Sequence, residues 1–332
     1  MRFSNVILGI FSVGVISAAS LAGCGGDTGG DGGGGSSSSS SSSSSGTASS
    51  SSGTTFPCSL GSSCKAVDKE CVGLVDNAGK TKFGLRMAQL DVTKPAALST
   101  GIVAGIVSGA VKMSDPGCNL SGGASFSWLL EFDTATSKLK TGGAKPVADP
   151  TTGYTFVNET LGGQMVAPIE YDTKPDASGA FSVTVGKDIV VPIFLDAAAT
   201  SYVLLPLKAA KFTGGTLSAS QNCVGKYNAE GLDPGNLCDA DAQNKTFITG
   251  AKLDGMITLE DADKVEVSSL QQTLCVLLAN NMGVAGPAGY KVCARDANNK
   301  ITFQGDACSS GTGCGDAVSL AADFAASSVK IN

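Results

Sequence analysis

Alternation of apolar and polar residues is the main pattern of the chain after residue 56. Every second residue of 126–132 is aromatic or leucine, which predicts a strand over 125–133 with one buried face. Residues 83–87 alternate too, and the apolar positions resume at Leu90 and Val92 after a shift that indicates a β-bulge. Further strands are expected at 181–185, 189–195, 202–207 and 300–304.

Other segments carry turn or helix signals. Residues 247–259 are predicted to form two strands, because Leu253-Asp254-Gly255 is typical of a hairpin turn. Apolar residues at helical spacing predict helices over 267–278, ending at Asn280-Asn281-Met282-Gly283, and over 315–326. The glycine-rich segment 95–113 is expected to be buried, as helix or strand.

The strands outnumber the helices in this pattern, and short strands joined by turns suit a composition rich in Gly, Ala, Ser, Thr and Val. We therefore predict a mostly β fold: an antiparallel β-sandwich or jelly-roll-like body with a few helices, stabilised by disulfides. An α+β fold is the alternative.

The first 55 residues differ in composition from the rest. A positive charge at Arg2, an apolar run to Ala19 and small residues after it form the pattern of a cleaved export signal over 1–23. Residues 24–55 are almost wholly Gly and Ser, so we expect a disordered tether. The folded extracytoplasmic domain is then 56–332, with a candidate sub-boundary near residue 214.

Residues Leu21, Ala22, Gly23 and Cys24 resemble the processing box of bacterial lipoproteins. With the tether and the cysteine-rich domain, they make the chain similar to uncharacterised bacterial surface lipoproteins. The resemblance implies cleavage before Cys24, lipidation of that cysteine and attachment to a membrane through the lipid. Gly25, in place of an aspartate, favours the outer membrane or cell surface.

The chain has eleven cysteines, and an even number remains if Cys24 carries lipid. Thiols oxidise outside the cytoplasm, so we predict disulfides among these ten. They are Cys58, Cys64, Cys71, Cys118, Cys223, Cys238, Cys275, Cys293, Cys308 and Cys314. Spacing alone does not fix the connectivity, but it favours the local pairs Cys223–Cys238, Cys275–Cys293 and Cys308–Cys314, with Cys118 joining the N-terminal group.

The absence of histidine excludes several classes of site. No Ser-His-Asp or Cys-His triad can form, and a zinc site lacks both histidine and Cys-x2-Cys pairs. The net charge of −6, without a Lys/Arg cluster along the sequence, argues against nucleic acid as a partner. We therefore expect no enzyme and no cofactor, but a binding or adhesion module for an extracellular ligand or protein. A structural envelope protein is the alternative.

One pair of carboxylates keeps a third hypothesis open. Glu131-Phe132-Asp133 resembles the first half of the Glu-x-Asp-x-x-Glu signature of retaining jelly-roll glucanases. The resemblance implies a polysaccharide hydrolase that uses Glu131 and Asp133, but Thr136 stands where that family has its acid.

Two kinds of ligand site follow from loop residues. Acidic loops suggest calcium, with Asp239, Asp241, Asp261 and Asp263 as candidate ligands and ordinary turn formation as the alternative. Aromatic platforms for sugars are scarce. The available tyrosines are Tyr154, Tyr171, Tyr202, Tyr227 and Tyr290.

Overall fold

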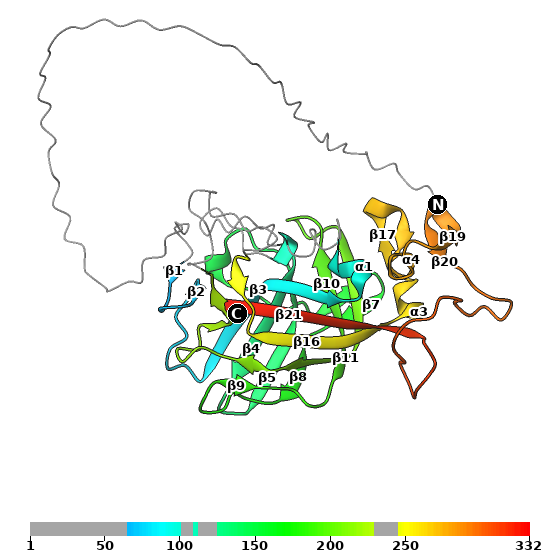
Figure 1. Ribbon diagram of the computed structural model, residues 1–332. Coiled ribbons are helices and arrows are strands. Elements are labelled where there is room, and N and C mark those ends of the chain that lie inside the picture. The colour runs from blue at the N-terminus through cyan, green and yellow to red at the C-terminus, as the bar shows by residue number, and fades with distance from the viewer. Residues whose placement is uncertain (1–64, 101–108, 112–124, 229–244) are drawn as a thin grey trace, which may run out of the picture. The chain divides into compact units, whose positions relative to one another are not determined.

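A curved antiparallel sheet organises the residues that the computed structural model describes, namely 65–100, 109–111, 125–228 and 245–332. Its strands follow the order β10-β11-β16-β21-β3-β4-β5-β8, and β13 pairs with one end of β21. The bounds are β3 (Lys82–Lys94), β4 (Ser127–Asp133), β5 (Lys138–Ala144), β8 (Ile169–Asp172), β10 (Lys187–Phe194), β11 (Tyr202–Thr213), β13 (Cys223–Val224), β16 (Ala251–Thr258) and β21 (Ala317–Val329). Figure 1 shows β21, in red, running between β16 and β3.

Short hairpins, a small sheet and short helices complete the described part. The hairpins pair β1 (Lys65–Ala66) with β2 (Val72–Gly73), β6 (Glu159–Leu161) with β7 (Gln164–Val166), β9 (Ala180–Phe181) with β12 (Gly215–Thr216), and β14 (Lys226–Tyr227) with β15 (Phe247–Ile248). The small sheet contains β17 (Glu266–Val267), β18 (Gln272–Thr273), β20 (Lys291–Cys293) and β19 (Gly283–Ala285). The helices are α1 (Ala96–Ser99), α3 (Leu259–Ala262) and α4 (Leu274–Leu278), with 3-10 turns at η1 (Pro150–Thr152), η3 (Ser268–Leu270) and η4 (Pro287–Gly289).

The inner face of the sheet carries the larger core. Trp128, Leu130 and Phe132 of β4 are buried on this face, as the alternation predicted. The ring of Phe212, from β11, lies 6.2 Å from Trp128 and 5.7 Å from Phe324 of β21, in edge-on contacts. Because β10 also contacts β5, the sheet folds over its own core in a sandwich-like arrangement. The structure confirms the predicted mostly β, antiparallel and disulfide-bearing fold.

A second, smaller core lies on the outer face. Leu129, Ala325 and Val329 point away from the main core and are covered by Tyr154 and Tyr227, among others. The strands near the end of β21 are therefore buried on both faces. On these strands, polar residues at positions where alternation predicts contact with solvent are therefore buried as well.

Arg86 is one of these polar residues, and it is fully buried. Its Nε donates to Ser127 Oγ (2.9 Å), and its Nη1 donates to the carbonyls of Met87 (3.1 Å) and Val111 (2.9 Å). Its Nη2 donates to the carbonyl of Phe126 (3.1 Å). The guanidinium thereby links β3 to the chain at residues 111 and 126.

The strand predictions were confirmed in β3, β4, β10 and β11. Pairing between β3 and β21 slips at Ala88, where Ala325 faces Gln89 and Ala326 faces Met87, so the predicted bulge is present. β11 extends beyond the predicted 202–207, as far as Thr213. Strands on both sides of residue 214 share one sheet, since β11 pairs with β16.

The hairpin at 253–255 and the helix over 315–326 were wrong. Leu253-Asp254-Gly255 lies inside β16, which is held straight by β11 on one side and β21 on the other. Residues 317–329 form β21, which pairs with β16 and β3 along its two edges. Strand partners on both edges satisfy the backbone N–H and C=O groups of β16 and β21. Neither segment therefore needs the hydrogen bonds of the turn or helix that its local sequence favours.

The remaining predictions held only in part. The helix expected over 267–278 is confined to α4 and the turn η3, and it stops as predicted, with Asn280 and Asn281 at positive φ. Of 181–185 only the short β9 is strand, and Val185 is exposed. Residues 300–304 contribute one isolated bridge, at Ile301. Of 95–113, α1 and residues 109–111 are helical, and 101–108 and 112–113 lie outside the described residues.

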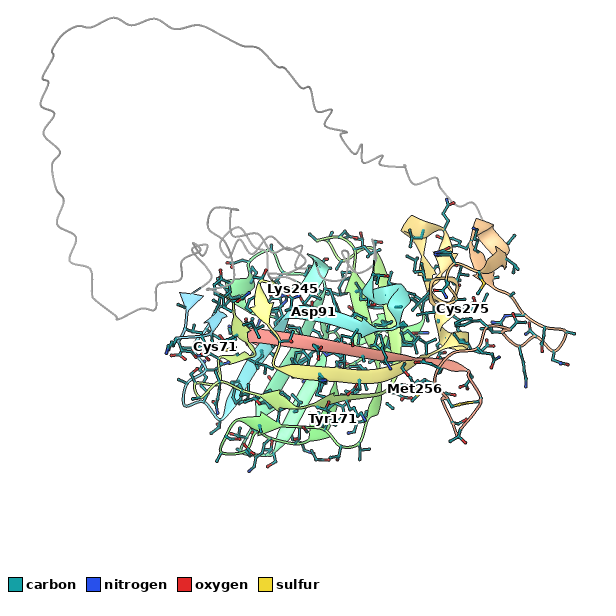
Figure 2. The ribbon with its side chains drawn as sticks, in the orientation of Figure 1. Cys71, Asp91, Tyr171, Lys245, Met256 and Cys275 are labelled. Atoms are coloured by element: carbon teal, nitrogen blue, oxygen red, sulfur yellow. A yellow bond between two sulfur atoms is a disulfide. The ribbon has the colours of Figure 1, made fainter. Side chains whose placement is uncertain are left out.

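Three disulfides are present among the described residues. Cys275–Cys293 and Cys308–Cys314 confirm the predicted local pairs. Cys223 bonds Cys71 instead of the predicted Cys238, because β2 and β13 both lie against the end of β21 and bring the two Cα atoms within 5.5 Å. Figure 2 shows Cys71 and Cys275 near opposite ends of β21. The residues Cys24, Cys58, Cys64, Cys118, Cys238, Asp239 and Asp241 lie outside the described part of the chain, as do the signal and the tether.

Candidate functional site

A cleft of about 500 Å³ lies where β21 ends, beside β3, β4 and β5. Four of its twelve lining residues are lysines, and Glu131 is the one acidic side chain among them. The lysines are Lys80, Lys82, Lys140 and Lys330. Since the chain as a whole carries a net charge of −6, the cleft is a local reversal of its charge. The lysines form no cluster along the sequence, because they come from three distant segments, around residues 81, 140 and 330, that the fold brings together.

The floor of the cleft is a row of residues paired across four strands. Val329 of β21 faces Gly84 of β3, Gly84 faces Glu131 of β4, and Glu131 faces Lys140 of β5. Glycine is required in this row, because a Cβ at Gly84 would lie 2.6 Å from Cγ1 of Ile331. The absent side chain leaves room for the C-terminal residues, which form one wall.

Glu131 forms an ion pair along the floor. Its Oε1 lies 3.2 Å from Nζ of Lys82, and the Glu131 side chain is 13% exposed, against 60% for Lys82. No other described residue donates a hydrogen bond to the Glu131 carboxylate. Its remaining lone pairs are therefore available to a ligand in the cleft.

The other three lysines form no ion pair with a described carboxylate. Lys140 instead lies over the ring of Phe156, with 4.8 Å between Nζ and the ring centroid, a cation–π contact that orients it. Lys80 lies near Asp76, whose pKa is lowered chiefly by the backbone N–H of Ala78 and the side chain of Asn222, and less by Lys80.

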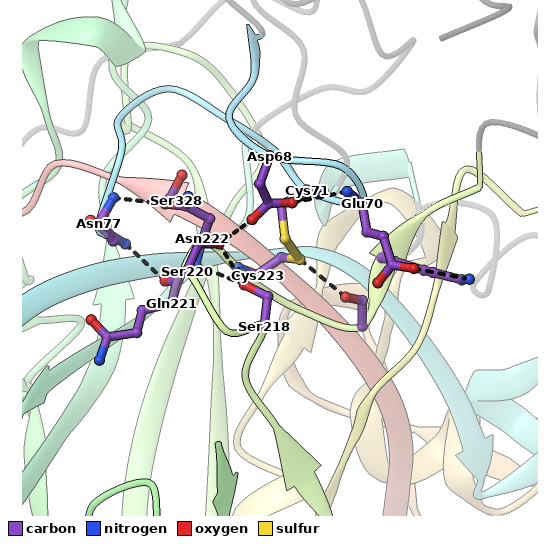
Figure 3. Close-up of a disulfide and its surroundings, with 12 residues drawn as sticks. Asp68, Glu70, Cys71, Asn77, Ser218, Ser220, Gln221, Asn222, Cys223 and Ser328 are labelled. Carbon is purple, nitrogen blue, oxygen red and sulfur yellow. Dashed lines mark hydrogen bonds and ion pairs between the residues drawn. A yellow bond between two sulfur atoms is a disulfide. The ribbon is translucent and has the colours of Figure 1, made fainter. Parts of the chain in front are cut away.

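One wall of the cleft is held by a buried amide network. The N–H of Asn77 donates to Oδ1 of Asn222 (2.7 Å), and Nδ2 of Asn77 donates to the carbonyl of Gly84 (3.1 Å). Nδ2 of Asn222 donates to Asp76 (3.0 Å). Figure 3 shows these amides beside the Cys71–Cys223 disulfide. Hydrogen bonds thus hold Asp76 and Asn77 to the sheet, and the disulfide fixes the chain a few residues earlier, at Cys71.

A second wall is held by the backbone of residues 330–332. The N–H of Tyr154 donates to the carbonyl of Lys330 (2.9 Å), and the N–H of Asn332 donates to the carbonyl of Tyr154 (2.8 Å). Both walls are therefore formed in the protein alone, so the backbone around the cleft requires little rearrangement to meet a ligand.

The two carboxylates of the hydrolase hypothesis have separate roles. Glu131 lines the cleft, whereas Asp133 does not. Oδ1 of Asp133 accepts the N–H groups of Thr136 and Ala135, each at 3.0 Å. The pKa of Asp133 is lowered, mainly by the Thr136 N–H, so this carboxylate stabilises the turn between β4 and β5.

The described calcium candidates are engaged by protein donors. Asp261 pairs with Lys264 at 3.1 Å. Asp263 accepts hydrogen bonds from Thr273 Oγ1 (2.9 Å), the N–H of Cys293 (2.8 Å) and Nη2 of Arg295 (2.9 Å). Two sulfurs near Asp263 belong to the Cys275–Cys293 disulfide and are not metal ligands. These contacts of Asp261 and Asp263 stabilise the local fold around α3.

The tyrosines do not provide an exposed platform beside the cleft. Tyr154, Tyr171 and Tyr227 are at most 5% exposed, and burial raises the pKa of Tyr171 to about 12. Tyr202 and Tyr290 are partly exposed, but neither lines the cleft.

Comparisons with protein-family models, curated proteins and solved structures found no match to this chain. Among the described residues, no helix combines the length and the apolar character needed to cross a membrane.

Proposed function

We propose that the chain is a lipid-anchored binding module, displayed at the bacterial outer membrane or cell surface, whose cleft binds an anionic extracellular ligand. The observation that carries the proposal is the grouping of Lys80, Lys82, Lys140 and Lys330 around a single acidic side chain in an acidic protein. Walls fixed by a disulfide and by buried amides support it, since a preformed site loses less conformational entropy on binding.

The anchor is proposed from the sequence. The Leu21–Cys24 box supports lipidation of Cys24, and the Gly/Ser tether supports display at a distance from the membrane. Cell fractionation tests this part: the parent chain is expected in the membrane fraction and the Cys24→Ala variant outside it.

We propose binding without catalysis. Retaining and inverting glycoside hydrolysis both use two carboxyl groups on either side of the scissile bond. Among the described residues, Glu131 is the one acidic side chain that lines the cleft, and Asp133 accepts the N–H groups of its turn.

The binding experiment uses the full chain in detergent, with polygalacturonate, a phosphomannan, inorganic polyphosphate and neutral dextran as probes. Replacing Lys140 and Lys330 together by Gln is expected to weaken binding of the anionic probes by about tenfold, because each exposed charge contributes up to about 1 kcal/mol. Added salt is expected to weaken the parent chain's binding as well.

The matched control removes two lysines that lie elsewhere on the sheet. Lys211 and Lys252, on β11 and β16, do not line the cleft, so their double replacement by Gln lowers the charge equally without touching the site. If both double variants weaken binding equally, the cleft is not the site. If no anionic probe binds, a structural envelope role replaces the proposal.

A further inference from the structure

The carboxylate of the cleft lies among its lysines. Glu131 faces Lys140 across the β4–β5 pair, and its Oε1 is 3.2 Å from Nζ of Lys82. Its side chain is only 13% exposed, so part of its hydration has been removed. A site that selected for negative charge alone would place no carboxylate at this position, because Glu131 repels an anion that the lysines attract.

Glu131 retains the capacity to accept hydrogen bonds. Lys82 is its one polar partner among the described residues, and a carboxylate has about four lone-pair positions. A hydroxyl that donates to such a carboxylate forms a short, charge-assisted hydrogen bond. The cleft therefore offers cations for an acidic group and, among the same lining residues, an anionic acceptor for a hydroxyl.

The lining also lacks the usual surface for a neutral sugar. The residues that line the cleft include no tyrosine or tryptophan, and the one aromatic, Phe83, is 4% exposed. A sugar ring has no exposed aromatic face to pack on here, so recognition depends on charge and hydrogen bonds.

We propose that the cleft recognises a hydroxylated, anionic sugar unit: its acidic group lies among Lys80, Lys140 and Lys330, and an adjacent ring hydroxyl donates to Glu131. This inference rests on the proposed binding function. The acidic group is supplied equally well by the carboxylate of a uronic acid or by a phosphate ester on a sugar. A cleft of about 500 Å³ has the size of a small-molecule site and accommodates one such unit of a longer polymer.

The test compares two variants that remove the same charge. Glu131→Gln keeps an acceptor oxygen, whereas Glu131→Met does not, and both make the cleft more positive by one charge. Binding of polygalacturonate or phosphomannan is expected to be about fivefold weaker for E131M than for E131Q, which corresponds to one lost hydrogen bond. Polyphosphate, which has no ring hydroxyl, is expected to bind both variants equally and more tightly than it binds the parent chain.

The sugar probes identify the acidic group: polygalacturonate as the better ligand indicates the carboxylate, and phosphomannan the phosphate ester. If E131Q and E131M bind every probe equally, the hydroxyl contact is absent and the inference is wrong, although the cleft still binds anions. If the parent chain binds no probe, the proposed function itself fails. Equal melting temperatures for E131Q and E131M would establish that a difference in their binding does not come from unfolding of one variant.

Discussion

Arg86 shows how a single residue departs from what the alternation of its strand predicts. It follows Leu85 and precedes Met87 on β3, at a position where alternation predicts solvent. The outer core covers it instead, and burial lowers the pKa of its guanidinium. No described carboxylate pairs with it. Three backbone carbonyls and Ser127 Oγ take its hydrogen bonds, and the ring of Tyr154 lies 5.7 Å from Cζ.

Replacing Arg86 by Met is expected to destabilise the protein by about 3 kcal/mol or more, because the carbonyls of Met87, Val111 and Phe126 lose their donor inside the protein. Denaturant unfolding measures the change. Arg86→Lys is the matched variant: it keeps the charge, but one ammonium cannot reproduce the planar fork that reaches three carbonyls. An R86K variant as stable as the parent would show that charge, and not geometry, is what this position requires.

At the scale of elements, β21 explains both the success and the failure of prediction from the sequence. Residues 318–326 carry Val, Leu, Ala, Phe and Ala at every second position, and all five side chains lie in the inner core. The same segment also has alanines at helical spacing, and alanine fits either structure. Only pairing with β16 and β3 decides between the two. The sequence of β4 is not ambiguous in this way. Trp128, Leu130 and Phe132 share one face of a strand, whereas a helix would point them in different directions.

The disulfides differ in how much of the chain they close, and their removal is expected to differ accordingly. Sequence separations of 152, 18 and 6 residues predict losses of about 5, 3 and 2 kcal/mol for the Cys71–Cys223, Cys275–Cys293 and Cys308–Cys314 bonds. Denaturant unfolding of the three double Cys→Ser variants gives the order. Removal of the Cys71–Cys223 bond is also expected to weaken the binding proposed for the cleft, since the chain just before residues 75–80 is no longer fixed to β13. The reverse order of stability would contradict the loop-closure explanation.

At the scale of the whole molecule, the cleft could not be predicted before the fold. The sequence pointed to Glu131, but as one of a catalytic pair with Asp133. Asp133 instead accepts the N–H groups of Ala135 and Thr136 in the turn that follows β4. The lysines at 80, 82, 140 and 330 are up to 250 residues apart, and their grouping depends on the register of β21, β3, β4 and β5. A shift of one residue in any pair would send these side chains to the opposite face.

The pH dependence of stability is also a property of the whole chain. Turn N–H groups lower the pKa of Asp133, Asp196 and Asp296 from 3.8, so their contribution is present above about pH 4 and is lost as the pH falls through the lowered values. Burial raises the pKa of Tyr171 from 10.0 to about 12, so its contribution is complete below pH 10 and is lost between pH 10 and 12. The chain has no histidine. Its melting temperature is therefore expected to be nearly constant between about pH 5 and 9, and a step near pH 6.5 would contradict this.

The Cys71–Cys223 bond also determines how the domain carries mechanical load. Tension on the chain before Lys65 first reaches β1 and β2, a hairpin of two-residue strands that separates at low force. At Cys71 the force then divides, and the covalent branch enters β13, which pairs with one end of β21. A pull from this end therefore reaches β21, which has strand partners on both edges, and not an edge strand such as β8 or β10. If the chain is attached at its N-terminal side, as we propose, the cleft would stay intact under flow after the β1–β2 hairpin had separated.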